Sequence, residues 1–209
     1  MSRDRPLAGL VVAGGYSSRF GEGDKALAEL AGRPLIRRVV DRLGATAQPL
    51  VVNCRDEQVE PIRDALQGCH GRVRFAIDPV PDRGPVAGVR TGLADLEREY
   101  TAVVACDLPF VDPELLVQLA DHADGHDGAV VRLESGWPQP LQAVYRSDAM
   151  ATACDATLES GSKRLLDVLE RLDVVTVPAT DLESIDPSAF ESIDTRDDLR
   201  TVENRLETS

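Results

Sequence analysis

A glycine-rich stretch that follows the first apolar run constrains the fold of this chain more than any other feature. Residues 11–25 read Val-Val-Ala-Gly-Gly-Tyr-Ser-Ser-Arg-Phe-Gly-Glu-Gly-Asp-Lys, and residues 10–12 predict a short buried strand just before the glycines. Gly14 and Gly15 let the backbone turn with its N–H groups open to an anion, because neither residue has a Cβ to block the approach. The stretch therefore predicts a phosphate-binding loop at the end of a first strand.

Two cations, Arg19 and Lys25, accompany this loop. Lysine occurs only at positions 25 and 163 among 23 basic residues, so the lysine at the end of the loop stands out. A P-loop would close its glycines with Lys-Ser/Thr, and a dinucleotide-binding turn would need Gly-x-Gly-x-x-Gly; neither pattern is present. A simple connecting turn is the alternative to a third kind of nucleotide loop.

Composition limits the classes of protein that fit. A chain of 209 residues predicts a single domain, residues 1–209. The formal net charge of −13 argues against a non-specific nucleic-acid binder or a membrane-surface protein, since both partners are polyanions. An acid-rich, lysine-poor surface is consistent with adaptation to high salt, with biased codon usage as the alternative.

The cysteines and the N-terminus suggest a compartment. Four cysteines, at positions 54, 69, 106 and 154, show no Cys-x-x-Cys spacing and no histidine in a metal-ligand pattern, which predicts reduced, mostly buried thiols. The first apolar segment is too short for a signal peptide or a membrane span. We expect a soluble, cytoplasmic protein.

Apolar strands and amphipathic helices alternate through the first half of the chain. This alternation predicts an α/β fold with a mostly parallel sheet, in which ligands bind beyond the carboxyl ends of the strands. Asn53 and Asp78 each follow a predicted strand, so we expect them to share one edge of the sheet with Gly14. The predicted strands span 10–12, 49–53, 73–77 and 101–106, and the predicted helices span 35–43, 57–66 and 113–121.

Asp107 follows the strand at 101–106 and is a candidate magnesium ligand. Mg²⁺ prefers oxygen ligands and is often held by one or two carboxylates together with substrate phosphates and water. The alternative is that Asp107 only turns the chain ahead of Pro109.

The second half of the chain is less informative. We expect a strand at 129–132, a loop into another strand at 136–145, a helix from 165, a core strand at 174–177 and a C-terminal helix after Thr195. Trp137 is either an exposed stacking surface for a pterin or a buried anchor, and we favour the anchor. Lys163 and Arg164 oppose the dipole of the helix they precede, so they either face an anionic ligand or form a solvated pair.

Three motifs together resemble the molybdenum cofactor guanylyltransferases, the MobA-like nucleotidyltransferases. They are Ala-Gly-Gly-x-Ser-x-Arg-Phe-Gly at 13–21 with Asp-Lys at 24–25, Gly-Pro-Val-Ala-Gly at 84–88, and Cys-Asp-x-Pro at 106–109. The resemblance is dense over residues 9–110 and thin afterwards. It implies a Rossmann-like three-layer sandwich of the nucleotidyltransferase type, with a nucleotide-binding half at about 7–110 and an acceptor-binding half at about 111–209.

The resemblance also implies a reaction and a set of site residues. GMP would pass from GTP to the phosphate of Mo-molybdopterin, giving molybdopterin guanine dinucleotide and pyrophosphate. Lys25, Arg19 and Asp107 would be catalytic, and Asp107 would hold Mg²⁺. The residues implied to bind GTP are Val12, Ala13, Gly14, Gly15, Lys25, Asn53, Asp78 and Asp107.

Several alternatives stay open at the level of sequence. Asp78 could accept from the guanine N1–H and N2–H₂ or contact the ribose. A sister enzyme could transfer CMP to the same cofactor or GMP to cobinamide phosphate, and a non-enzymatic protein could carry the cofactor. Where the family usually shows Asn-x-Asn-Thr-Pro, this chain has Ser192, Asp194 and Arg196 in place of the asparagines and the proline. Cofactor-insertion proteins and molybdoenzyme apoproteins are possible protein partners.

Overall fold

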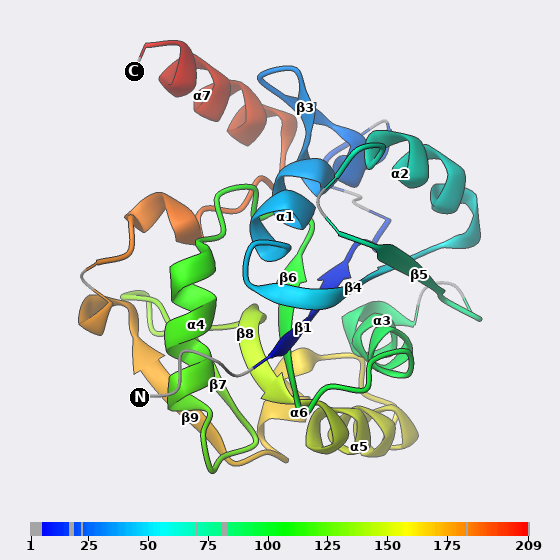
Figure 1. The fold of residues 1–209 in the computed structure, drawn as a ribbon, viewed down its shortest axis with the longest axis vertical. Helices are drawn as coiled ribbons and strands as arrows, with labels where there is room; N and C mark the ends of the chain where they lie inside the picture. Colours follow the sequence, from blue (N-terminus) through cyan, green and yellow to red (C-terminus); the bar gives the residue numbers. More distant parts are fainter. Residues whose placement is uncertain are drawn as a thin grey trace.

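A seven-stranded β-sheet runs through the centre of the computed structural model, with helices on both faces (Figure 1). The structure describes residues 6–16, 19–21, 23–69, 71–80, 83–182 and 184–208. In the order in which they lie across the sheet, the strands are β5 (Val73–Ile77), β4 (Ala47–Cys54), β1 (Leu7–Val12), β6 (Tyr100–Ala105), β8 (Pro138–Arg146), β7 (Gly128–Arg132) and β9 (Val174–Pro178).

The central strand β1 divides its side chains between two cores, because successive residues of a strand point to opposite faces. Val11 packs into the core on one face, whereas Leu10 and Val12 pack into the core on the other. The first core contains side chains of α1 (Leu35–Leu43), α2 (Val59–Ala65) and α4 (Pro113–His122). The second contains side chains of α3 (Gly84–Leu93), α5 (Ser147–Glu159) and α6 (Leu165–Leu169). This is the predicted three-layer α/β sandwich.

The register of three parallel strands positions the functional edge of the sheet. Val12, the last residue of β1, lies opposite Asn53 of β4 on one side and Ala105 of β6 on the other. The segments that leave these three strands therefore start side by side. β8 runs antiparallel to β6, so the beginning of β8 reaches this same edge.

A smaller unit caps that edge. A two-stranded sheet of β2 (Glu29–Leu30) and β3 (Arg33–Pro34) packs with the C-terminal helix α7 (Arg196–Glu207) around a third core of buried apolar side chains. Short 3₁₀ turns complete the chain: η1 (Lys25–Leu27), η2 (Asp56–Gln58), η3 (Ala179–Asp181) and η4 (Pro187–Phe190). Figure 1 shows α7 extending away from the main sheet.

Two predictions for the second half were wrong. Trp137 is not a buried anchor: its residue is 63% exposed, because residues 133–137 form a tight turn beyond the last paired residues of β7 and β8. β9 is not a core strand but the outermost strand of the sheet, and among its residues only Val177 is buried.

The other expectations for the fold agree with the structure. The predicted strands and helices of the first half are present, and Thr195 caps α7 by accepting from the backbone N–H of Asp198. Cys54, Cys106 and Cys154 are buried free thiols, and Cys69 is half-buried. Within the described ranges, no helix combines the length and apolar character needed to cross a membrane.

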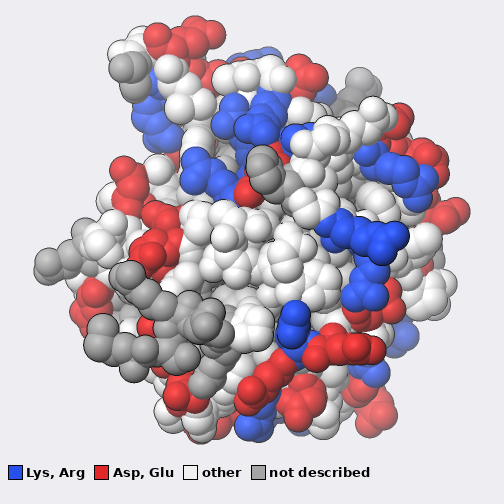
Figure 2. All heavy atoms as spheres, in the orientation of Figure 1, with Lys and Arg blue, Asp and Glu red and all other residues white. Residues whose placement is uncertain are grey.

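The acidic surface makes stability depend on salt. Figure 2 shows acidic side chains in separate groups around one face, and the net charge of −13 implies self-repulsion that salt screens. Raising KCl from about 0.1 M to about 2 M should stabilise the fold by about 1–2 kcal/mol, which raises the melting temperature by roughly 2–8 °C in a chain of this size. Differential scanning calorimetry measures this directly. The effect should shrink near pH 4, where carboxylates lose charge, and an unchanged melting temperature at neutral pH would contradict it.

Candidate functional site

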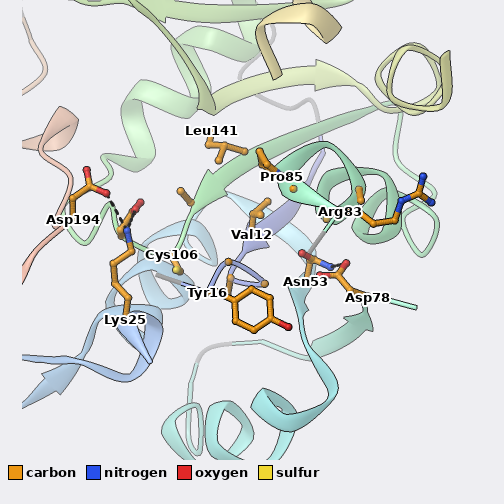
Figure 3. Close-up of a pocket in the computed structure, with 18 of the residues that line it drawn as sticks. Val12, Tyr16, Lys25, Asn53, Asp78, Arg83, Pro85, Cys106, Leu141 and Asp194 are labelled. Atoms are coloured by element: carbon orange, nitrogen blue, oxygen red, sulfur yellow. Dashed lines mark hydrogen bonds and ion pairs between the residues drawn. The ribbon is translucent and has the colours of Figure 1, made fainter. Parts of the chain in front are cut away.

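A cavity of about 290 Å³ opens at the edge where β1, β4 and β6 end (Figure 3). Segments that are far apart in the sequence form its walls, including the glycine loop, the start of α3 and the segment ahead of α7. The structure places every residue implied to be catalytic or to bind GTP on its lining. These residues are Val12, Ala13, Gly14, Gly15, Arg19, Lys25, Asn53, Asp78 and Asp107.

Lys25 lies between two carboxylates at one end of the cavity. Its Nζ is 2.5 Å from Oδ2 of Asp107 and 3.2 Å from Oδ1 of Asp194. The residue is only 9% exposed. Burial alone would lower the pKa of Lys25, but the charge and hydrogen bond of Asp107, with the charge of Asp194, raise it above its ordinary value. Lys25 therefore remains a cation throughout the neutral range.

The backbone around Lys25 is fixed by a local cap. Asp24 accepts from the backbone N–H of Ala26 at 2.9 Å and so caps η1, the short turn that carries Lys25. A capped turn holds its first residue in a defined direction. This explains why the Asp-Lys pair of the sequence motif stays together at the cavity wall.

Asp194 is a site residue that the sequence left without a role. Its carboxylate also accepts from Nη2 of Arg19 at 3.1 Å, at the more exposed rim of the cavity. The backbone N–H of Ile193 donates to the carbonyl of Asp107 at 2.9 Å, which holds the two acidic residues close together. Asp198 accepts from the N–H of Asp194 at 3.1 Å. The capping box of α7 thus aims Asp194 at both cations.

Asn53 and Asp78 meet at the other end of the cavity. Nδ2 of Asn53 donates to Oδ1 of Asp78 at 2.7 Å and to the carbonyl of Ala76 at 3.2 Å. Burial raises the pKa of Asp78, although the hydrogen bond from Asn53 acts to lower it. Oδ1 of Asn53 is buried and accepts no hydrogen bond from any described part of the protein. A buried acceptor without a partner is costly, so this atom is suited to a donor on a ligand.

Two glycines make room for this polar pair. A Cβ on Gly14 would lie 2.5 Å from Oδ2 of Asp78, and a Cβ on Gly88 would lie 2.4 Å from Oδ1 of Asn53. Real side chains do not approach so closely, so any larger residue would displace the amide or the carboxylate. The two glycines come from separate sequence motifs, which indicates that both motifs serve the same cavity.

The carboxylates next to Lys25 can be tested as a metal site. Asp107 and Asp194 offer hard oxygen donors at the cavity end that also contains two cations. Among the described residues, no cluster of three or more His, Cys, Asp or Glu side chains could hold a metal unaided. This donor set fits Mg²⁺, which takes one or two carboxylates and completes its shell with phosphate oxygens and water.

Comparison with known proteins identifies the family. The family model described as "MobA-like NTP transferase domain" matches residues 9–175. The chain belongs to the MobA-like NTP transferase family. It is 47% identical over 199 residues to a probable molybdenum cofactor guanylyltransferase of Natronomonas pharaonis, covering 95% of this chain and 97% of the relative. A similarly named protein of Haloferax mediterranei is 37% identical, covering 97% of this chain and 95% of that relative.

A solved structure supports the same assignment for this MobA-like chain. Molybdopterin-guanine dinucleotide biosynthesis protein A from Archaeoglobus fulgidus superposes with a TM-score of 0.79 at 28% identity. The match covers 97% of this chain and 100% of the other. The fold predicted from the sequence, an α/β nucleotidyltransferase with a mostly parallel sheet, is therefore confirmed.

Other lining residues of the MobA-like cavity escaped the sequence analysis. Tyr16 and Val80 are exposed apolar side chains on its wall, and Leu141 reaches it from the start of β8. By contrast, neither Lys163 nor Arg164 lines the cavity. Tyr16 is exposed and lies in a loop, where side chains follow no periodic pattern, so the sequence gives little reason to select it.

The close approach of Gly88 to Asn53 predicts that Gly88→Ala changes the free energy of unfolding in opposite directions in two backgrounds. Gly88→Ala should lower the free energy of unfolding by about 1–3 kcal/mol, because the added methyl overpacks against Oδ1 of Asn53. In an Asn53→Ala background the same change should stabilise α3 by up to about 1 kcal/mol, since alanine favours a helix over glycine. Urea unfolding of the four proteins measures the coupling. Equal losses in both backgrounds would show that the contact is not the cause.

Proposed function

We propose that this chain transfers GMP from GTP to the phosphate of Mo-molybdopterin, giving molybdopterin guanine dinucleotide and pyrophosphate. The observation that carries the proposal is the Lys25–Asp107 pair at one end of a cavity whose other end presents Asn53 and Asp78. A cation and carboxylates suit a triphosphate, and a buried amide beside a carboxylate suits a nucleoside. Family membership and the names of the relatives point to the same reaction.

The chemistry requires charge compensation more than proton transfer. An oxygen of the acceptor phosphate attacks the α-phosphorus of GTP, and the bond from that phosphorus to the bridging oxygen of the β-phosphate breaks, which releases pyrophosphate. The attacking phosphate is already ionised near neutrality, so no general base is needed. No described residue on the cavity wall is a histidine, and burial keeps the Cys106 thiol protonated by raising its pKa.

Lys25 supplies the charge that stabilises the transferring phosphate. In the free protein its ammonium donates to Asp107 and Asp194, so it is desolvated and oriented before substrate arrives. A preorganised cation in a partly closed site acts more strongly on developing charge than one in water. Arg19, at the exposed rim, would neutralise the outer phosphates.

Asp107, with Asp194, would hold Mg²⁺. The bound metal would supply positive charge that neutralises the phosphate oxygens. Asp107 then has two tasks, because it orients Lys25 in the free protein and provides a metal ligand in the loaded one. Asp194 pairs with both Lys25 and Arg19, so it couples the two cations whether or not a metal is present.

Asn53 and Asp78 would recognise the nucleoside. Oδ1 of Asn53 lacks a donor from the protein, and Asp78 has one oxygen occupied by Asn53 and another facing Gly14. An amide oxygen and a carboxylate can accept from the N1–H and N2–H₂ of guanine, a donor pair that cytosine lacks. Proteins that deliver the molybdopterin or receive the product are a further part of the proposal.

Asp107→Ala should reduce pyrophosphate release by about a hundredfold or more, a loss typical of removing a transition-state charge contact. The assay contains GTP, Mg²⁺ and Mo-molybdopterin, with CTP and cobinamide phosphate in parallel arms. Asp121→Ala, which removes an exposed carboxylate from α4, is the matched control and should leave the rate unchanged. Undiminished release by Asp107→Ala, or none by the wild type, refutes the proposal.

Asp78→Asn should separate binding from stability. The raised pKa of Asp78 means that its ionised form lowers the stability of the fold at neutral pH. The neutral variant should therefore have a free energy of unfolding at least as large as that of the wild type. It should nevertheless bind GTP more weakly. The GTP affinity of the wild type should fall on acidification, because protonation of Asp78 removes an acceptor, and its raised pKa brings this loss to a higher pH than an ordinary aspartate would. The variant should show a flatter profile. Calorimetric titration measures the GTP affinity of the wild type and of the variant at each pH.

The same variant tells base contact from ribose contact. If Asp78 binds the base, Asp78→Asn loses the preference for GTP over ITP, which lacks the N2 amine. If it binds the ribose, the preference for GTP over dGTP is lost instead. Retention of both preferences would exclude Asp78 from nucleoside recognition.

A further inference from the structure

Three consecutive backbone carbonyls of the glycine loop are held from outside the cavity by two side chains. Nε2 of Gln58 donates to the carbonyl of Ala13 at 3.1 Å. Nη1 of Arg55 donates to the carbonyl of Gly14 at 2.9 Å and to that of Gly15 at 2.8 Å. Both side chains follow β4, at the entry to α2, and neither carries a role in the chemistry described above.

These contacts fix the direction of the loop's N–H groups. The C=O and N–H of one trans peptide point in opposite directions, so carbonyls held toward Arg55 and Gln58 turn the following N–H groups the other way. Those N–H groups belong to Gly14, Gly15 and Tyr16, all on the cavity wall. Within the described ranges none of the three donates a hydrogen bond. Successive free N–H groups form a concave site for an anion.

The two side chains are themselves tightly held. Gln58 is 2% exposed, and its Oε1 accepts from the backbone N–H of Arg55 at 2.9 Å. The guanidinium of Arg55 donates to Glu57 at 2.6 Å and lies 4.4 Å from the centre of the Tyr16 ring. Side chains with this many contacts cannot reorient without losing several of them.

The same two side chains also contact the turn that carries Lys25. Nε2 of Gln58 also donates to Oδ2 of Asp24, and Arg55 lies 3.7 Å from that carboxylate oxygen. Asp24 in turn caps η1 through the N–H of Ala26. Arg55 and Gln58 therefore connect the glycine loop to the position of Lys25 through one set of hydrogen bonds.

We propose that Arg55 and Gln58 are positioning residues for the triphosphate of GTP. They do not touch the substrate; they hold the loop carbonyls away so that three N–H groups face the phosphates, and they fix the turn that presents Lys25. This inference rests on the proposed function. It adds the residues that preorganise the site to those that contact the nucleotide.

The chemical identity of each side chain matters for this task. Arg55 spreads its donors over a planar fork, so it serves two carbonyls, Glu57 and Asp24 at once, which a lysine ammonium on a flexible stem does not reproduce. Gln58 needs an amide nitrogen facing a carbonyl and a carboxylate. Gln58→Glu would place an acceptor against both, although its length is the same.

Thermal shifts with three probes test the inference. GTP, tripolyphosphate and guanosine should each raise the melting temperature of the wild type by mass action. Arg55→Gln should lose at least tenfold in affinity for GTP and tripolyphosphate, an amount equal to about 1.4 kcal/mol, and less than twofold for guanosine. Arg55→Lys restores the charge without the fork and should recover less than half of that loss in free energy. Gln58→Glu should behave like Arg55→Gln.

Arg63→Gln is the matched control, because it removes one positive charge from α2, where Arg63 pairs with Glu60 at the surface. It should bind all three probes as the wild type does. If Arg55→Gln keeps its affinity for GTP and tripolyphosphate, or loses affinity for guanosine to the same extent, the positioning role is wrong. If the wild type itself does not bind GTP, the proposed function fails instead, whatever the variants do.

Discussion

The alignment of three parallel strands is the constraint on which the site depends. Val12 ends β1 level with Asn53 and Ala105, and two backbone hydrogen bonds extend this alignment past the strands: the N–H of Ala13 donates to Asn53, and the N–H of Cys106 donates to Val12. Because β1 is buried on both faces, it cannot slip by one residue without exchanging its two cores. The packing of the sheet therefore sets the spacing between the Lys25 end and the Asn53 end of the cavity.

The charge around the cavity differs from the charge of the molecule as a whole. The molecule as a whole is strongly acidic, yet the buried Lys25 lies on the cavity wall and the half-buried Arg55 lies directly behind the glycine loop. Lys25 tolerates burial because Asp107 and Asp194 accompany it, and Arg55 tolerates burial because it is surrounded by carbonyls, an acid and an aromatic ring. Each cation is thus fixed by the protein before any phosphate binds, which limits the reorganisation needed during reaction.

The sequence predicted what is encoded locally. Lys25, Asp107 and the glycines belong to short motifs, and Asn53 and Asp78 follow apolar strands, so their common edge could be inferred from a parallel sheet. Asp194, Arg55 and Gln58 were not predicted, because their roles come from contacts across long sequence separations. The helix α5 was missed because, apart from Met150, its buried side is made of small residues such as Ala153 and Thr157, which give little periodic signal. The antiparallel direction of β8 follows from its pairing partners and leaves no mark in its own sequence.

The position of Asp194 in the sequence has a consequence for the order in which the site forms during synthesis on the ribosome. It lies 169 residues after Lys25 in the sequence, yet its carboxylate contacts the Lys25 ammonium. The sheet and the glycine loop can be complete while Lys25 still has a single carboxylate partner. Asp194 is synthesised after all of these elements, so the nascent polypeptide completes the charge cluster around Lys25 only when the segment ahead of α7 docks.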